Sequence, residues 1–134
     1  MKSNHLFIAL VGLLGFSACN NNDQLFHLVS PEKSGIDFTN TITVNDTINI
    51  LESEFTYNGG GVAVGDLNGD GLQDIYFAGN QVQNKLYLNK GELKFEEVIE
   101  KAGAQKTKGQ WSSGVTFVDI NSDGKQDIYV CNTM

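Results

Sequence analysis

The chain has 134 residues, of which 40% are hydrophobic and 19% charged, a balance that excludes an intrinsically disordered segment and favours one globular unit. One proline and fifteen glycines, beside many Val, Ile, Phe and Tyr residues in short runs, favour a β-rich protein with glycine-containing turns. The net charge is -7, so the chain does not have the excess of Lys and Arg that nucleic-acid binding requires, and we expect no nucleic-acid partner.

Residues 1–18 have the layout of a secretory signal peptide. Lys2 and the free amino terminus precede an apolar run from Leu6 to Phe16, and the small residues Ser17 and Ala18 follow. This run is shorter than the about 20 residues that a membrane-spanning helix needs. We therefore expect export of the protein rather than a permanent transmembrane helix.

The end of this signal, Phe16-Ser17-Ala18-Cys19, resembles the lipobox of bacterial lipoproteins. The resemblance implies cleavage before Cys19, lipidation of that cysteine, and anchoring to the cell envelope, most simply at the outer membrane. Residues 19–24 then form a lipidated, polar tether. The alternative is ordinary signal cleavage beside a fortuitous cysteine. The other cysteine, Cys131, lies in an apolar stretch, where we expect a buried and inert thiol.

Residues 25–60 mix apolar side chains with Thr and Asn. Ile42, Val44, Ile48 and Ile50 stand at even spacing, the period at which side chains share one face of a strand. We therefore expect one or two N-terminal strands in this region.

The second half of the chain contains a repeat. Residues 61–77 align with residues 114–130 at an offset of 53 residues. This period suits a propeller blade or array unit, which cannot bury a core alone and is stabilised by its neighbours. The alignment predicts a first blade over 61–113 and an incomplete second blade over 114–134.

Short apolar runs predict four strands in the first unit. They cover Val62 to Leu67, Asp74 to Ala78, Lys85 to Asn89 and Lys94 to Val98. Four short antiparallel strands are the plan of a propeller blade. Residues Glu96 to Ala104 also fit helical spacing, so a short helix is the alternative there.

Each repeat contains an acidic loop of nine residues, Asp66 to Asp74 and Asp119 to Asp127. Oxygen-bearing side chains stand at positions 1, 3, 5 and 9, which are Asp66, Asn68, Asp70 and Asp74 in one loop and Asp119, Asn121, Asp123 and Asp127 in the other. The backbone carbonyl at position 7, Leu72 or Lys125, would add a further oxygen ligand. Gly71 and Gly124 at position 6 permit the sharp bend. The sequence predicts two Ca²⁺ sites, one in each loop.

Other interpretations of these loops fit less well. Zinc prefers Cys and His, which neither loop contains, and Mg²⁺ prefers a smaller shell rich in water. An EF-hand needs Glu at position 12, where the sequence has Phe77 and Val130. Simple hairpin turns would not require four matched ligands in two equivalent loops.

The spacing Asp-x-Asn-x-Asp-Gly-x-x-Asp followed by Ile-Tyr resembles the FG-GAP or VCBS repeat of integrin-like β-propellers. The segments from Gly79 to Asn89 and from Trp111 to Gly114 are similar to VCBS-repeat lipoproteins of Bacteroidetes related to the CRTAC and UnbV group. The resemblance implies an all-β, partial β-propeller with under two blades. It also implies an N-terminal portion of a longer protein, whose C-terminal part supplies the remaining blades.

The function expected from this resemblance is a non-enzymatic, calcium-binding module in adhesion or in binding an unknown protein or glycan ligand. The alternative is the propeller part of a larger polysaccharide-active or other hydrolytic or lyase enzyme. No Ser, His and Asp constellation stands out, because His5 lies in the signal and His27 near the tether, so we expect no catalytic residue. Trp111 is either a core residue or an aromatic platform for a sugar.

Overall fold

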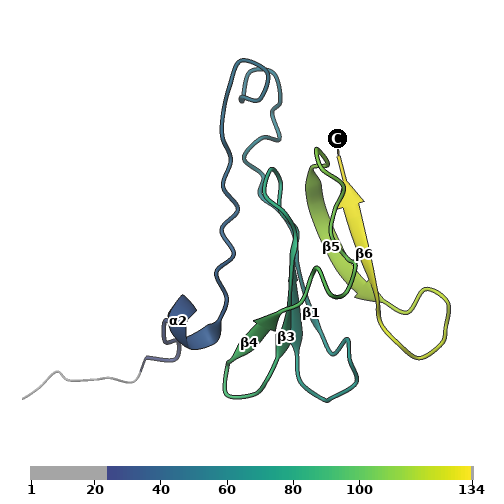
Figure 1. Cartoon of the computed structure of the whole chain (residues 1–134). Coiled ribbons are helices and arrows are strands. Elements are labelled where there is room, and N and C mark those ends of the chain that lie inside the picture. Colours follow the sequence, from purple (N-terminus) through teal and green to yellow (C-terminus); the bar gives the residue numbers. More distant parts are fainter. Residues whose placement is uncertain (1–23, 134) are drawn as a thin grey trace, which may run out of the picture.

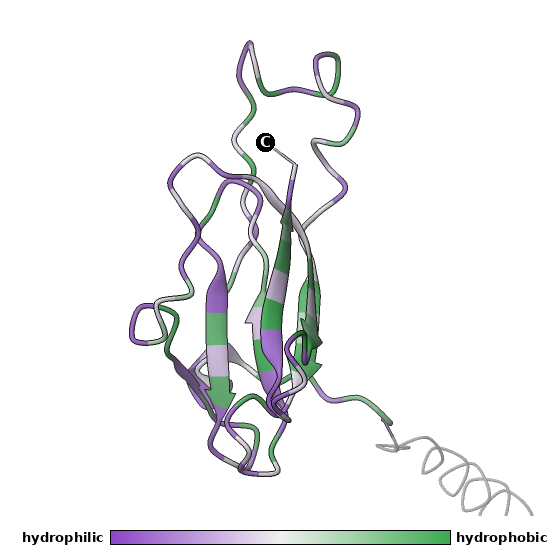
Figure 2. Cartoon of the chain, turned by 90° about the vertical axis from the view of Figure 1, so that its right-hand side faces the viewer, coloured by the Kyte–Doolittle hydropathy of each residue, from purple (hydrophilic) through white to green (hydrophobic). Residues whose placement is uncertain are grey.

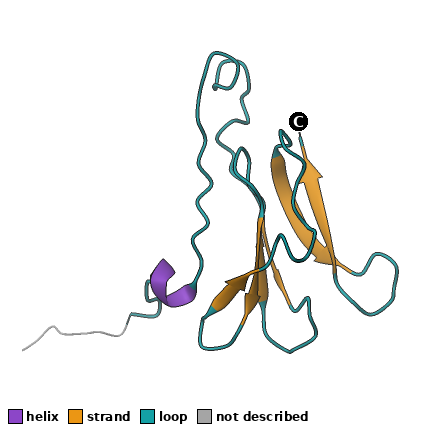
Figure 3. Cartoon of the chain, viewed as in Figure 1, coloured by secondary structure: helices purple, strands orange, loops and turns teal. Residues whose placement is uncertain are grey.

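The computed structural model describes residues 24–133, so the predicted signal peptide, Cys19 and nearly all of the tether lie outside the described residues. Strands and long connections account for almost all of this part of the chain (Figure 3). The elements are α2 (Pro31–Ser34), β1 (Val62–Gly65), β2 (Asp74–Phe77), β3 (Lys85–Asn89), β4 (Phe95–Glu97), β5 (Ser112–Val118) and β6 (Asp127–Asn132). In this range, no helix has the length and apolarity needed to cross a membrane.

The first four strands form one antiparallel sheet, sheet A, in the order β1-β2-β3-β4. Side chains alternate between its two faces, and Figure 2 shows hydrophilic and hydrophobic bands along some of the strands. The four predicted strands are confirmed. β3 has the predicted bounds, and the other three are one to two residues shorter at their ends.

Strands β5 and β6 pair antiparallel as a second sheet, sheet B, whose strand β5 lies against β1 (Figure 1). The core lies between the sheets. Tyr76 and Leu86 of sheet A are buried there, and Val115 and Phe117 of sheet B pack against them. The prediction of an all-β, partial propeller is therefore confirmed, with one sheet of four strands and one of two.

The prediction of N-terminal strands over residues 25–60 is wrong. Within the described part of this range, the only regular element is the four-residue helix α2. The Asn45 side chain accepts hydrogen bonds from the backbone N–H groups of Thr47 and Ile48, and Asn49 does the same for Leu51. These local bonds hold the backbone in turns and take the donors that a strand ladder would need.

Residues 35–44 nevertheless cross the outer face of sheet A, on the side opposite sheet B, as an extended segment held by side chains. The Phe38 ring stacks on Phe77 with ring centroids 4.8 Å apart. The Tyr87 hydroxyl donates a hydrogen bond of 2.6 Å to the Asp37 carboxylate. Further along the segment, the Asn40 side-chain amide donates a hydrogen bond to the side-chain oxygen of the buried Asn80. The segment therefore covers apolar surface that sheet B does not reach.

We expect Tyr87→Phe to lower the free energy of unfolding by about 1 kcal/mol at neutral pH, because the hydrogen bond from Tyr87 to a charged carboxylate is lost. The hydrogen bond from Tyr87 lowers the pKa of Asp37 in the folded protein. This bond therefore stabilises the fold fully at pH values above the pKa that Asp37 has in the unfolded chain. This stabilisation disappears as the pH falls through the lower, folded pKa. Urea unfolding should show a gap between wild type and variant that narrows in acid. A gap that is constant with pH would contradict the assignment.

Two further expectations, and one difference between the repeats, are settled by exposure and local bonding. Residues 98–104 form hydrogen-bonded turns, such as the bond from the Ala102 N–H to the Val98 carbonyl, rather than the alternative helix. Cys131 is exposed, so the prediction of a buried thiol is wrong. Tyr129 is 54% exposed although its counterpart Tyr76 is buried. Both differences follow from the lack of a covering sheet over this face of sheet B within residues 24–133.

Candidate metal centre

The two acidic loops lie at the same end of the two sheets, one between β1 and β2 and the other between β5 and β6 (Figure 1). Their backbones bend in the same way. Position 6 has a positive φ in both loops, 83° at Gly71 and 85° at Gly124. Position 4 is also positive, 77° at Gly69 and 61° at Ser122. The repeat in the sequence is therefore a repeat in conformation.

The first aspartate of each loop closes the bend by accepting backbone hydrogen bonds. Asp66 Oδ2 accepts from the Gly71 N–H at 2.8 Å, and Asp119 Oδ2 accepts from the Gly124 N–H at 2.8 Å. The other oxygen, Oδ1, accepts from the N–H of the residue at position 5 in both loops. Each carboxylate thus lies inside its loop and faces the backbone donors.

Positions 3 and 5 bond to each other in both loops. The Asn68 amide donates to Asp70 at 2.9 Å, and the Asn121 amide donates to Asp123 at 3.0 Å. All four of these residues are exposed. The Leu72 N–H and the Asn68 amide lower the pKa of Asp70 below its ordinary value, so this carboxylate is charged at neutral pH.

The last aspartate distinguishes the two loops. Asp74 is completely buried and accepts from two backbone groups, the Leu67 N–H at 3.0 Å and the Asn89 N–H of β3 at 2.9 Å. Asp127 accepts the equivalent bond from the Ile120 N–H at 3.1 Å. Within the described residues, no third strand of sheet B supplies the second bond. Asp74 is therefore held more firmly than Asp127.

The side chains are close in the loop but do not converge on one point. Among residues 24–133, no three His, Cys, Asp or Glu side chains lie together closely enough to hold a metal ion. The predicted position-7 residues, Leu72 and Lys125, are both exposed in the bends. A hollow of about 430 Å³ separates the loops and is lined by residues of both, including Asp66 and Lys125.

The donor chemistry of each loop fits calcium. Carboxylate, amide and backbone carbonyl oxygens are the ligands of a hard cation, and neither loop contains a nitrogen or sulfur ligand that would favour zinc. The exposed pairs at positions 3 and 5 are the parts that would have to reorient. Binding would exchange the bond between Asn68 and Asp70 for bonds to the cation.

Comparison with known proteins agrees with this repeated loop. Residues 66–130 match the family model of the FG-GAP-like repeat. This part of the chain is similar to an FG-GAP-like repeat. Cartilage acidic protein 1 of Xenopus tropicalis is 35% identical over 77 residues, which cover 57% of this chain and 12% of that protein. The chain thus matches about an eighth of the length of this relative. No solved structure matches the chain.

The FG-GAP-like segment runs from the first residue of the first acidic loop into β6, so it includes both loops and all of β2, β3, β4 and β5. The FG-GAP-like repeat suggests an integrin-like β-propeller module. Sheet A has the four antiparallel strands of one blade, and sheet B has the first two strands of the next.

Two features of this end of the molecule are absent from the sequence prediction. The Asn89 backbone N–H fixes Asp74, and a backbone donor leaves no trace in residue type. The burial of Asp74 is likewise a product of packing, since its counterpart Asp127 is half-buried. The repeat alignment alone treats the two loops as equal.

Proposed function

We propose that this FG-GAP-like segment is a calcium-binding module of an exported, lipid-anchored envelope protein that acts in adhesion or in binding a protein or glycan ligand. The observation that supports it best is the duplicated loop, in which each pair of equivalent aspartates shares at least one equivalent hydrogen bond. A loop that only reverses the chain would not need three carboxylates in each copy.

Calcium would serve the architecture of the blades. Each loop joins the first two strands of its sheet, so a cation held by both ends of the loop would fix those strands relative to each other. Asp66 lies directly after β1 and Asp74 is the first residue of β2. The ligand surface would then be built on the remaining loops of a stiffened scaffold.

Anchoring is the second part of the proposal. Lipidation of Cys19 would place the module at the outer membrane, with residues 20–24 as a short polar tether. Metabolic labelling with a palmitate analogue, compared between wild type and Cys19→Ser, tests this directly. Label that persists in Cys19→Ser would contradict it.

The two proposed calcium sites should differ in affinity. The first loop should bind more tightly because Asp74 is already held by two N–H groups, whereas Asp127 has one. Calorimetric titration with CaCl₂ should give two sites in wild type. Asp119→Ala should keep the tighter one and Asp66→Ala the weaker one.

The two variants are matched, because both replace position 1 and both remove the same bond to a position-6 glycine. A titration with no heat of binding in wild type would reject calcium as the ligand. Equal residual affinity in the two variants would reject the ordering while leaving calcium binding in place.

We assign no catalytic residue to the module. All six aspartates of the two loops are used in closing the bends, and His27 is exposed near the tether. An assay of the exported full-length product on polysaccharides, with and without Ca²⁺, separates a binding module from the enzyme alternative.

A further inference from the structure

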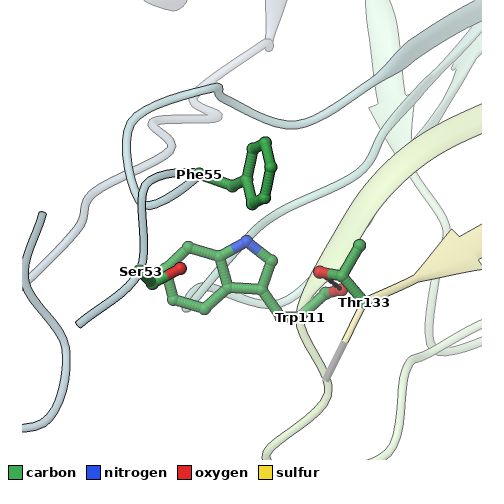
Figure 4. A pocket seen from close by; sticks show the side chains of 4 residues that line it. All are labelled: Ser53, Phe55, Trp111 and Thr133. Carbon is green, nitrogen blue, oxygen red and sulfur yellow. Dashed lines mark hydrogen bonds between the residues drawn. The ribbon is translucent and has the colours of Figure 1, made fainter.

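A small pocket lies at the end of the sheets that is opposite the acidic loops (Figures 1 and 4). Its lining comes from the long connection before β1, from the residue before β5 and from the residue after β6: Ser53, Phe55, Trp111 and Thr133. The volume is about 140 Å³. None of the four lining side chains is charged, so the pocket has two aromatic rings and two hydroxyl groups.

Trp111 forms one wall and is 7% exposed. Figure 4 shows its indole nitrogen on the edge of the ring nearest Phe55. No residue between 24 and 133 accepts a hydrogen bond from this N–H. An almost buried indole therefore presents, on its edge toward Phe55, a donor that no residue between 24 and 133 uses.

The Trp111 backbone is fixed at the edge of sheet B. Its carbonyl accepts a hydrogen bond of 2.9 Å from the Thr133 N–H. The next residue, Ser112, is completely buried and bonds to Asn132 through its hydroxyl and to Asn80 through its carbonyl. The backbone from which the indole projects is consequently fixed before any ligand arrives.

Phe55 forms the opposite wall and is 70% exposed, so core packing does not account for its position. The loop that carries it is stiff. The buried Thr56 hydroxyl bonds to the carbonyls of Ser53 at 2.8 Å and Asn49 at 3.2 Å, and the Asn58 N–H bonds to the Phe55 carbonyl at 3.1 Å. A rigid loop thus presents an aromatic ring over the pocket.

We propose that this pocket binds one neutral pyranose ring of a glycan. The C–H face of a sugar packs on an aromatic ring, its oxygens accept a bond from the indole N–H, and its hydroxyl groups pair with those of Ser53 and Thr133. A charged ligand finds no counter-ion in the lining. The volume is below the 300–1,000 Å³ of typical drug-sized sites, so it admits a single ring. The inference rests on the proposed ligand-binding function and names its ligand class and location.

Trp111 is the sole tryptophan of the chain, so its fluorescence reports on this pocket alone. We expect saturable changes in emission when the protein, in buffer with Ca²⁺, is titrated with at least one of four probes: cellohexaose, maltohexaose, xylohexaose and mannohexaose. Phe55→Ala should weaken the binding at least tenfold. Tyr57→Ala is the matched control, because Tyr57 is 58% exposed on the same loop but does not line the pocket.

The proposal is overturned if no probe changes the emission saturably, or if Phe55→Ala binds as tightly as wild type. It is also overturned if Tyr57→Ala weakens binding as much as Phe55→Ala does. The melting temperature with and without chelator, measured on the same samples, reports separately on calcium. A calcium-dependent Tm without sugar binding would reject sugar binding at this pocket and leave the calcium proposal in place. Sugar binding with a calcium-independent Tm would support the pocket and reject the calcium proposal.

Discussion

Removal of calcium should lower the thermal stability of the protein substantially. At a free Ca²⁺ concentration 100 times Kd, each occupied site stabilises the folded state by about 2.7 kcal/mol, so two sites contribute about 5 kcal/mol. One site alone corresponds to a Tm change of about 10 °C or more for a domain of roughly 100 residues. Differential scanning fluorimetry with added CaCl₂ and with EGTA measures this directly.

The physical reason is the concentration of charge in the loops. Each loop has three carboxylates within nine residues, and such like charges repel one another and favour an open loop unless a cation balances them. Calcium would neutralise this repulsion where β1 joins β2 and where β5 joins β6. The blades and the metal should therefore be lost together on heating.

The control is the double variant Asp66→Ala, Asp119→Ala, which should melt at the same temperature with CaCl₂ and with EGTA. MgCl₂ should stabilise wild type less than CaCl₂ does, because Mg²⁺ requires a smaller octahedral shell. A wild-type melting curve that is indifferent to chelator and to added Ca²⁺ would count decisively against the calcium proposal.

Gly60→Ala should destabilise the fold by at least about 3 kcal/mol, a loss comparable with much of the stability of a small domain. A Cβ at this position would lie 1.7 Å from the Ala78 carbonyl oxygen and 2.9 Å from the Ala78 carbonyl carbon. Both are backbone atoms directly after β2, and the Ala78 N–H bonds to the Gly61 carbonyl at 2.8 Å. The clash cannot be relieved without separating β1 from β2.

The neighbouring glycine provides the control. Gly59 has a φ of +78° but no atom within 4 Å of an added Cβ, so Gly59→Ala should cost only about 1–2 kcal/mol of left-handed strain. Urea unfolding of the two variants and wild type separates the effects. Equal losses of unfolding free energy in the two variants would mean that the close approach of Gly60 to the Ala78 carbonyl does not constrain the fold.

The strands of sheet A and the bends of the acidic loops could be predicted from the sequence because their causes are local. Short apolar runs such as Leu86 to Leu88 mark strands without reference to their partners. Gly71 and Gly124 occupy the positive-φ positions that the loop spacing requires. The order of strands in the first blade then follows from short connections between antiparallel neighbours.

The errors share a different cause. The even spacing of apolar residues from Ile42 to Ile50 is typical of a strand, yet the side chains of Asn45 and Asn49 bond to the backbone and hold it in turns. The sequence shows both patterns and does not show which of them has the lower free energy. Cys131 looked like a core residue because its neighbours in sequence are apolar, and the repeat alignment pairs Tyr129 with the buried Tyr76. Their exposure depends on whether a further sheet covers that face.

The repeat, the spacing of oxygen donors in its two loops and the short apolar runs of the blade strands can all be found in the amino-acid sequence, because each is a property of consecutive residues. Whether the two copies are equivalent depends instead on tertiary packing. Asp74 is buried and doubly bonded because β3 lies beside it, while Asp127 has one bond. Tertiary packing likewise brings Phe55 and Trp111, 56 positions apart, to opposite walls of one pocket. Contacts between distant segments depend on how the sheets pack, and no local pattern encodes them.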